Sequence, residues 1–283
     1  MASIIDIHPH VIATDTARYP LNPLGGTQST WSRERPTTYA MLIAAMDEAG
    51  VDKAAIVQAS TAYGYDNTYV AEAVAAHPKR FTGVFSVDVL APDAVAKMRH
   101  WTQRGLTGLR LFTTGSTMPG QATWFADPRT YPAWQHAGEA GLPVCMQMTP
   151  QGFPQLRELM QKFPKVRIIL DHLARPHVVD GPPYAADRDF FAFADSPNVF
   201  LKVTPLNYMP ANWGKASPGS FFAKLVEEFG AQRIAWGSNF PATAGTLQDN
   251  LVQARKALAL LSAHDQEWIF GKTAQALYPA LGD

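Results

Sequence analysis

The sequence predicts a (β/α)8 barrel, and we expect residues 1–283 to form one domain of this kind with long loops at the carboxyl ends of its strands. Eight short runs are mostly apolar rather than alternating, which is typical of parallel strands covered on both faces. Segments with helical periodicity lie between them, and 283 residues suit such a barrel. A doubly wound open sheet is the alternative, but no Gly-x-Gly-x-x-Gly follows the first run.

The predicted elements alternate along the whole chain. The expected strands span residues 4–8, 53–59, 82–87, 106–112, 143–149, 166–172, 199–204 and 233–238. Helices are expected at 39–49, 68–76, 93–104, 131–140, 154–162, 185–194, 220–229, 247–261 and 265–277. Most of these helices stop at a glycine or shortly before a proline, the residues that most often end a helix. Asp66 and Asn67 suit the cap of the second helix, and Leu251, Leu258 and Leu261 form the clearest apolar stripe.

Three segments without a strand or helix pattern are unusually long. They span residues 11–36, 113–127 and 205–218, and each follows an expected strand. Loops of about 12 residues or more are usually lids or binding loops. Because active sites of (β/α)8 barrels lie at the carboxyl ends of the strands, we expect the three loops to surround one site.

The composition indicates a small-molecule enzyme rather than a protein that binds nucleic acid or spans a membrane. The 24 Lys and Arg residues balance the 24 Asp and Glu residues, and no basic block is present. No apolar run approaches ~20 residues and no signal peptide is recognisable, so we expect a cytoplasmic protein. The single cysteine, Cys145, lies in an apolar run and is expected to be a buried structural thiol. Aromatic residues on the long loops would suit a homodimer.

The first expected strand ends on two histidines, His8 and His10. Residues two apart in a strand point to the same side, so both imidazoles should face the mouth of the barrel. His172 ends the sixth expected strand and should join them, while its neighbour Asp171 should point away and have a structural role. Three converging histidines could hold a divalent metal, or they could act as hydrogen-bonding groups around an anion, and the residues alone leave both open.

Cationic residues also lie at the expected strand ends. Arg110 is near the end of an apolar strand and needs a partner, either inside the barrel or as a substrate carboxylate. Arg175 would provide a second grip on the carboxylate, and Lys202 would provide a third or pair with Asp171. These cations predict a small anionic substrate, and the aromatic residues on the long loops, among them Trp31, favour a flat or cyclic one. The remaining substrate-binding candidates are Gln58, at the end of the second strand, and Tyr65, in the loop after it.

Four motifs together resemble the amidohydrolase superfamily. They are His8-Pro9-His10, Gly108-Leu109-Arg110, Asp171-His172-Leu173-Ala174-Arg175 and Trp236-Gly237-Ser238-Asn239-Phe240-Pro241. Within the superfamily the chain is similar to the amidohydrolase-2 branch, near 2-pyrone-4,6-dicarboxylate hydrolase and sugar-acid lactonases. The resemblance implies a (β/α)8 barrel that hydrolyses or decarboxylates small, often carboxylated, substrates. Some members hold Zn²⁺ or Mn²⁺, whereas the pyrone hydrolase and its near relatives work without a metal.

Asn239 departs from the family pattern, which usually has an aspartate there as metal ligand or general base. An amide cannot take up a proton and is a poor metal ligand. Either the position carries an engineered Asp→Asn change, or His8, His10 or His172 is the base, or the reaction needs no activated water. The last case would resemble the galactarolactone isomerases, which also have Asn in this motif. The family's carboxylated lysine is missing too, so we expect no tightly bound cofactor, with one Zn²⁺ or Mn²⁺ ion as the alternative.

We therefore expect a hydrolase that opens a small carboxylated lactone or a similar cyclic ester. The arginines would hold the carboxylate, the three histidines would polarise the carbonyl, and Asn239 would position water. The alternatives are a lactone isomerase without net hydrolysis, a metal-dependent decarboxylase of a carboxylated ring, and a non-catalytic binder of small anions.

Overall fold

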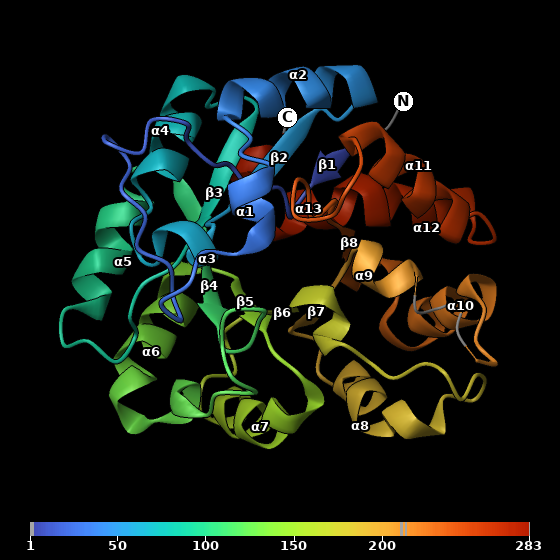
Figure 1. Cartoon of the computed structure of the whole chain (residues 1–283). Coiled ribbons are helices and arrows are strands. Elements are labelled where there is room, and N and C mark those ends of the chain that lie inside the picture. The colour runs from blue at the N-terminus through green and yellow to red at the C-terminus, as the bar shows by residue number, and fades with distance from the viewer. Residues whose placement is uncertain (1–2, 210–211, 213, 283) are drawn as a thin grey trace.

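The computed structural model describes residues 3–209, 212 and 214–282, and it confirms the predicted (β/α)8 barrel (Figure 1). Eight parallel strands follow one another around the sheet in sequence order. The Ile7 amide donates to the Trp236 carbonyl at 3.2 Å, which brings the end of the first strand beside the last and nearly closes the barrel. The strands are β1 (Ile5–Asp6), β2 (Lys53–Val57), β3 (Phe81–Phe85), β4 (Leu106–Phe112), β5 (Val144–Gln147), β6 (Ile168–Leu170), β7 (Val199–Val203) and β8 (Ile234–Trp236).

The longer helices cover the outside of the barrel (Figure 1). Two expected helices are interrupted: 185–194 breaks into short turns around α8, and a π-turn at Trp268–Lys272 separates α12 from α13. No helix in the described part of the chain is long and apolar enough to cross a membrane. The helices are α1 (Thr30–Glu34), α2 (Tyr39–Ala49), α3 (Ser60–Tyr63), α4 (Thr68–Ala76), α5 (Ala94–Thr102), α6 (Tyr131–Ala140), α7 (Phe153–Lys162), α8 (Arg188–Phe191), α9 (Pro205–Tyr208), α10 (Pro218–Phe229), α11 (Leu247–Ala257), α12 (Ala263–Glu267) and α13 (Thr273–Leu277).

Two apolar clusters stabilise the fold, one between strands and helices and one inside the barrel. Successive strand residues point to opposite faces, so strands such as β2 and β6 contribute to both clusters. Leu277, Tyr278 and Leu281 from the C-terminal segment enter the inner cluster beside Cys145, which is fully buried as expected. Arg110 pairs in register with Cys145, so its side chain also points inward. The interior is therefore apolar at the C-terminal segment and charged toward the mouth.

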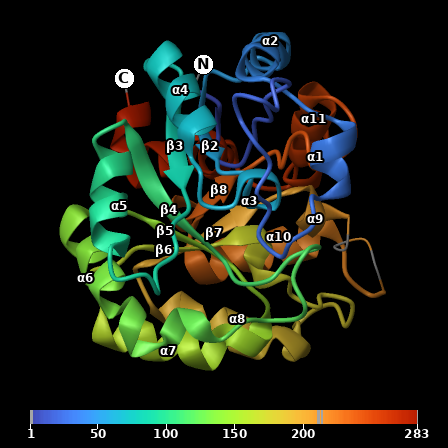
Figure 2. The ribbon, with the colours of Figure 1, turned by 60° about the vertical axis from the view of Figure 1, so that its left-hand side comes forward.

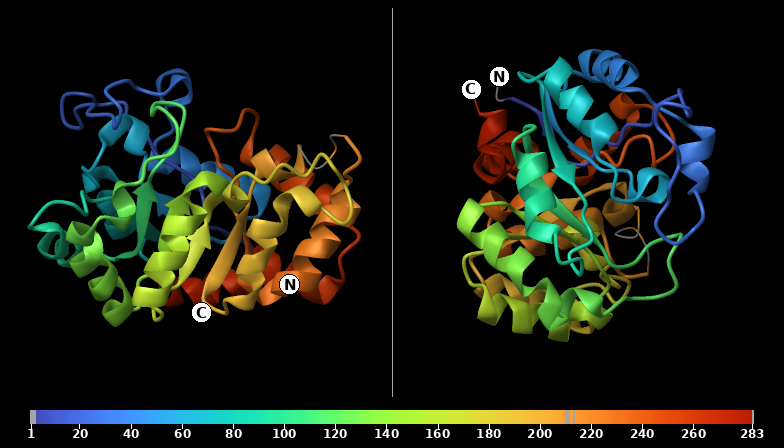
Figure 3. Two further views of the ribbon diagram at one scale, coloured as in Figure 1. Left: turned by 90° about the horizontal axis from the view of Figure 1, so that it is seen from below. Right: turned by 90° about the vertical axis from the view of Figure 1, so that its left-hand side faces the viewer.

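The long loops gather at the carboxyl end of the strands, opposite the two termini (Figures 2 and 3). The loop after β1 contacts the loop after β4, where the Thr117 hydroxyl donates to the Leu24 carbonyl at 3.1 Å. Gly25 makes this approach because its φ is +83° and a Cβ there would lie 1.9 Å from the Thr117 carbonyl oxygen. The predicted crowding of loops at one face is present, although residues 210, 211 and 213 of the loop after β7 lie outside the described residues.

Candidate active site

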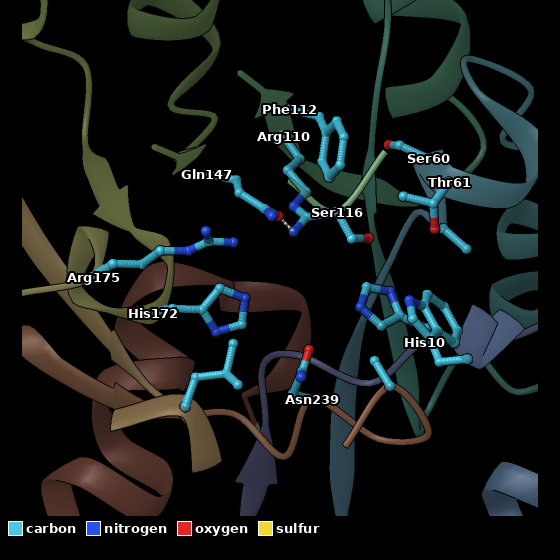
Figure 4. Close-up of a pocket in the computed structure, with 14 residues that line it drawn as sticks. His10, Ser60, Thr61, Arg110, Phe112, Ser116, Gln147, His172, Arg175 and Asn239 are labelled. Atoms are coloured by element: carbon cyan, nitrogen blue, oxygen red, sulfur yellow. Dashed lines mark hydrogen bonds between the residues drawn. The ribbon is translucent and has the colours of Figure 1, made fainter. Parts of the chain in front are cut away.

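A cavity of about 230 Å³ opens at the carboxyl end of the barrel, beneath the loops (Figure 4). Its size suits a small ring rather than a polymer. Among the described lining residues two are arginines and none is an acid, so the cavity is positively charged. The lining residues are His10, Trp31, Ala59, Ser60, Thr61, Arg110, Phe112, Ser116, Gln147, His172, Arg175, Leu206, Asn239 and Ala242.

His10 has a defined tautomer. Its Nδ1 lies 2.8 Å from the Val57 carbonyl oxygen, which can only accept, so Nδ1 carries the proton and Nε2 is a free base. The ring stacks on Trp31 with 5.1 Å between centroids, which fixes its plane. Burial, and then the charge of Arg110, lower the pKa of His10 to about 3, so the imidazole is neutral at physiological pH.

The segment that supplies His172 and Arg175 has an uncommon backbone. All four residues His172, Leu173, Ala174 and Arg175 have φ between 52° and 58°, in the left-handed region, although none is a glycine. This conformation costs about 1–2 kcal/mol per residue for ordinary side chains. Asn207 holds the turn by donating from Nδ2 to the His172 carbonyl at 2.9 Å. The strained backbone brings the side chains of His172 and Arg175 toward one cavity from positions three residues apart (Figure 4).

Asp171 was expected to point away from the mouth and to have a structural role; its side chain points into the barrel interior, where its contacts with Lys202 and Arg110 are structural. The left-handed turn begins directly after it, so the strand alternation on which the expectation relied no longer holds at residue 172. Its carboxylate is buried inside the barrel, 2.7 Å from Lys202 Nζ and 3.0 Å from Arg110 Nε. Burial alone would raise the pKa of Asp171, but Lys202 and Arg110 together hold it well below its usual range.

The arginines differ in how they are held. Arg110 donates to Asp171 through Nε and to Gln147 Oε1 through one terminal nitrogen, so it is fixed in place with part of its guanidinium facing the cavity. Arg175 is exposed, and its guanidinium makes no hydrogen bond or ion pair with any residue that the structure describes, although its backbone amide donates to the His172 carbonyl at 3.0 Å. In Figure 4 its guanidinium points toward the cavity, so it is available to an anion.

Asn239 lies at the end of β8 with φ 54°, a conformation that Asn tolerates well. Its Nδ2 donates to Thr243 Oγ1 at 3.0 Å, which turns the side-chain oxygen toward the cavity (Figure 4). The β8 end also approaches β1 closely, because a Cβ on Gly237 would lie 2.5 Å from the His8 Cβ. Asp6 joins the two ends by accepting from the amides of His8 and Ser238 at 2.9 and 2.8 Å.

Four predicted site residues do not line the cavity. His8 is fully buried between the rings of His10 and His172, at centroid distances of 5.0 and 4.8 Å. Lys202 is fully buried and pairs with Asp171, which was one of the two roles predicted for it. Its assignment to substrate binding is therefore corrected. Gln58 bonds to the carbonyls of Gly64 and Asp66, and Tyr65 is exposed outside the cavity.

Sequence reasoning missed several lining residues. Ser60, Thr61 and Ser116 come from a short helix and a loop at the mouth, where strand periodicity gives no direction for a side chain. Loop length was the only signal for Ser116, and Ser60 and Thr61 had none. The position of Gln147 could be predicted, because it lies near the end of the fifth expected strand; in the structure it is the last residue of β5 and pairs with the last residue of β4.

The chain belongs to the amidohydrolase family, whose model matches residues 5–280. This match confirms the predicted resemblance. A relative from Burkholderia ambifaria, L-fucono-1,5-lactonase, is 28% identical over 127 residues, which cover 42% of each chain. The chain therefore spans less than half the length of the curated relatives that it matches.

Solved structures share the fold across the whole chain. A Pseudomonas putida protein described as a proposed 2-pyrone-4,6-dicarboxylic acid hydrolase is 21% identical, covers 100% of both chains and superposes with a TM-score of 0.77. An amidohydrolase from Burkholderia multivorans with bound zinc is 20% identical, with 98% of this chain and 99% of the other covered and a TM-score of 0.76. At such identities the likeness concerns the fold alone.

The charges around the three histidines disfavour a divalent cation there. The carboxylate near the histidines, Asp171, lies 3.8 Å from His8 Nδ1 but is already paired with Lys202 and Arg110. These two cations also lower the pKa values of His10 and His172, so a further positive charge at the same place would be repelled. Among the described residues no three His, Cys, Asp or Glu side chains are arranged as a metal site.

Proposed function

We propose that this protein hydrolyses a small lactone that carries a carboxylate. The observation that carries the proposal is the charge of the cavity, which Arg110 and Arg175 line without an opposing acid among the described lining residues. Guanidinium groups bind carboxylates strongly and with defined geometry. The relatives named after a pyrone dicarboxylate and a sugar lactone support a cyclic ester as the reacting group.

In the proposed reaction His10 Nε2 takes a proton from a water molecule as the water oxygen attacks the lactone carbonyl. The side-chain oxygen of Asn239 accepts the second hydrogen bond of that water and orients it. The tetrahedral intermediate then collapses by breaking the ring carbon–oxygen bond, and protonated His10 returns its proton to the leaving oxygen. The products are an alcohol and a carboxylic acid, which releases its proton to the solvent and becomes a carboxylate.

His172 is the proposed donor to the oxyanion. Its Nδ1 lies 2.7 Å from Thr204 Oγ1, whereas Thr204 Oγ1 is 3.4 Å from Asn207 Oδ1. We assign the hydroxyl proton to the shorter contact, which makes Nδ1 the acceptor and leaves Nε2–H for the substrate. Burial lowers the pKa of His172 to about 3, and Asp171 opposes this effect, so the ring remains a neutral donor.

Turnover in water enriched in heavy oxygen tests the proposal. The probes are 2-pyrone-4,6-dicarboxylate, which is anionic, and L-fucono-1,5-lactone, which is neutral. We expect the anionic probe to react faster and one heavy oxygen to enter the new carboxylate. No turnover of either probe, or faster turnover of the neutral one, would contradict the proposal.

Lactone isomerisation is the second candidate, and Asn239 favours it. An amide takes up no proton, and a hydroxyl of the substrate could replace water as the nucleophile. The labelling experiment separates the two reactions, because an isomerised lactone contains no oxygen from the solvent.

Arg175→Ala is expected to raise KM for the carboxylated lactone and to leave stability unchanged, because the side chain is exposed and unpaired among the described residues. A charge-assisted hydrogen bond contributes about 1.5–3 kcal/mol, so kcat/KM should fall by about 10-fold to 150-fold. Steady-state kinetics measures the change. The matched control is the neutral lactone, whose kcat/KM should hardly move; equal losses for both would remove Arg175 from anion binding.

The pH profile is expected to lack the acid limb of an ordinary histidine. Because the pKa of His10 is lowered to about 3, the free base persists as pH falls, and kcat/KM should be level from about pH 8 to about pH 5. A buried neutral histidine also makes the fold less stable as pH falls from 6.5 toward 3, so circular dichroism must accompany each point. An acid limb near 6.5 would contradict the lowered pKa of His10.

The proposed reaction uses only the residues of this chain. Dialysis against a chelator should therefore leave kcat/KM unchanged, with metal content measured before and after. Loss of activity that Zn²⁺ or Mn²⁺ restores would overturn this part of the proposal and would favour the metal-dependent alternatives.

A further inference from the structure

A second cavity of about 540 Å³ adjoins the catalytic cavity, and we call it the annex. Arg175 and Leu206 line both cavities and form the wall between them. The rest of the annex is mainly apolar, with Val178 and Phe221 buried and Val179 46% exposed. The annex is therefore an apolar space that continues from the place where the proposed function puts the substrate carboxylate.

The annex is built into the same framework as the catalytic turn. Asp187, itself buried, accepts from the amides of His177 and Val178 at 2.8 and 2.9 Å and so fixes the segment that follows Arg175. On the opposite wall, Asn207 of α9 holds the turn through the His172 carbonyl. Both walls are thus fixed relative to His172, and the annex is already formed without a ligand.

The lining selects the chemistry of the occupant. A cation at one end and apolar surface beyond it suit a small molecule in which an apolar group lies next to a carboxylate. Val179 and Leu206, at 46% and 40% exposure, are large apolar side chains that present surface to the annex. A purely polar sugar acid would leave this surface in contact with water.

We propose that the annex is a subsite for an apolar substituent of the carboxylated substrate. The inference rests on the proposed function, because the carboxylate held between the two cavities sets the direction of the substituent. A substituent that enters the annex loses its contact with water, which strengthens binding by about fourfold per methylene.

The test compares the carboxylated lactone with derivatives that carry a propyl or a hexyl group beside the carboxylate. The measured quantity is the ratio of kcat/KM for the substituted and unsubstituted lactones. We expect the propyl derivative to exceed the parent by about 10-fold to 60-fold.

Val179→Trp, which fills the annex, and Val179→Asp, which makes it polar, should each lower this ratio by about tenfold. The matched controls are Val252→Trp and Val252→Asp on α11, where the valine is 57% exposed, and these should leave the ratio unchanged.

The outcomes separate failure of the annex from failure of the proposed function. If the parent lactone reacts and the ratio stays near one, or if the Val252 variants lower it as much as the Val179 variants, the annex is not a substituent site. If the parent does not react, calorimetry with hexanoate against acetate tests the annex alone, and equal affinities would overturn it. A change of oligomeric state in Val179→Asp, with the ratio unaltered, would assign the surface to a second copy of the chain and also overturn the inference.

Discussion

Replacing His10 with asparagine is expected to lower kcat for lactone hydrolysis by about 10²-fold to 10⁴-fold, the usual contribution of a general base. Asparagine retains a donor near the position of Nδ1, so the hydrogen bond to the Val57 carbonyl is kept while the free base is lost. Stopped or continuous assays of acid release measure the rate, and thermal unfolding shows whether the variant folds. A kcat above a tenth of the original would mean that another group takes the proton.

The Asn239→Asp change, added to His10→Asn, tests whether a carboxylate at residue 239 can replace the lost base. Both Asn and Asp tolerate the left-handed backbone at this position, so the substitution adds a proton acceptor with little strain. In the His10→Asn background, the new carboxylate is expected to restore part of the lost hydrolysis. If activity stayed at the level of the single variant, Asn239 would not face the attacking water.

Asp171→Asn is expected to lower the free energy of unfolding by about 3–5 kcal/mol, because Lys202 would remain buried without its counter-charge. Denaturant titration followed by fluorescence measures the loss. The same change at Asp127, in the exposed pair with Arg129, should alter stability little. The double variant Asp171→Asn/Lys202→Met should recover most of the stability, because it removes the unpaired charge. A loss of the same size in Asp171→Asn, in the Asp127 variant and in the double variant would contradict the explanation.

The stabilisation from Asp171 should persist into acid. Lys202 and Arg110 hold the pKa of its carboxyl below the ordinary range despite burial, so the charged form survives as pH falls. The contribution is fully present above the pKa of the unfolded chain, near 4, and is lost only as pH falls through the lower pKa of the folded state. The difference between Asp171→Asn and the unchanged protein should therefore be level between pH 5 and pH 8.

The sequence predicted those features that depend on the strand period and on the position of strand ends. His10, Arg110 and Asn239 reach the cavity because each follows or ends a short parallel strand. The inward direction of Asp171 was not predicted because the backbone becomes left-handed at residue 172, and a run of four non-glycine residues in that region has no sequence signal. Gln58 and Tyr65 failed to reach the cavity because loop hydrogen bonds and the α3 turn direct them elsewhere.

The run of left-handed residues from His172 to Arg175 has a consequence for how the barrel can change its substrate. The proposed oxyanion donor and the proposed carboxylate receptor belong to one short contiguous segment whose internal geometry is set by its own backbone and by β7 and α9. The loops after β1 and β4 close the mouth without forming this segment. We therefore expect chimaeras that exchange those two loops to accept different rings. The distance between the polarised carbonyl and the bound anion should stay the same in such chimaeras, because one segment sets it.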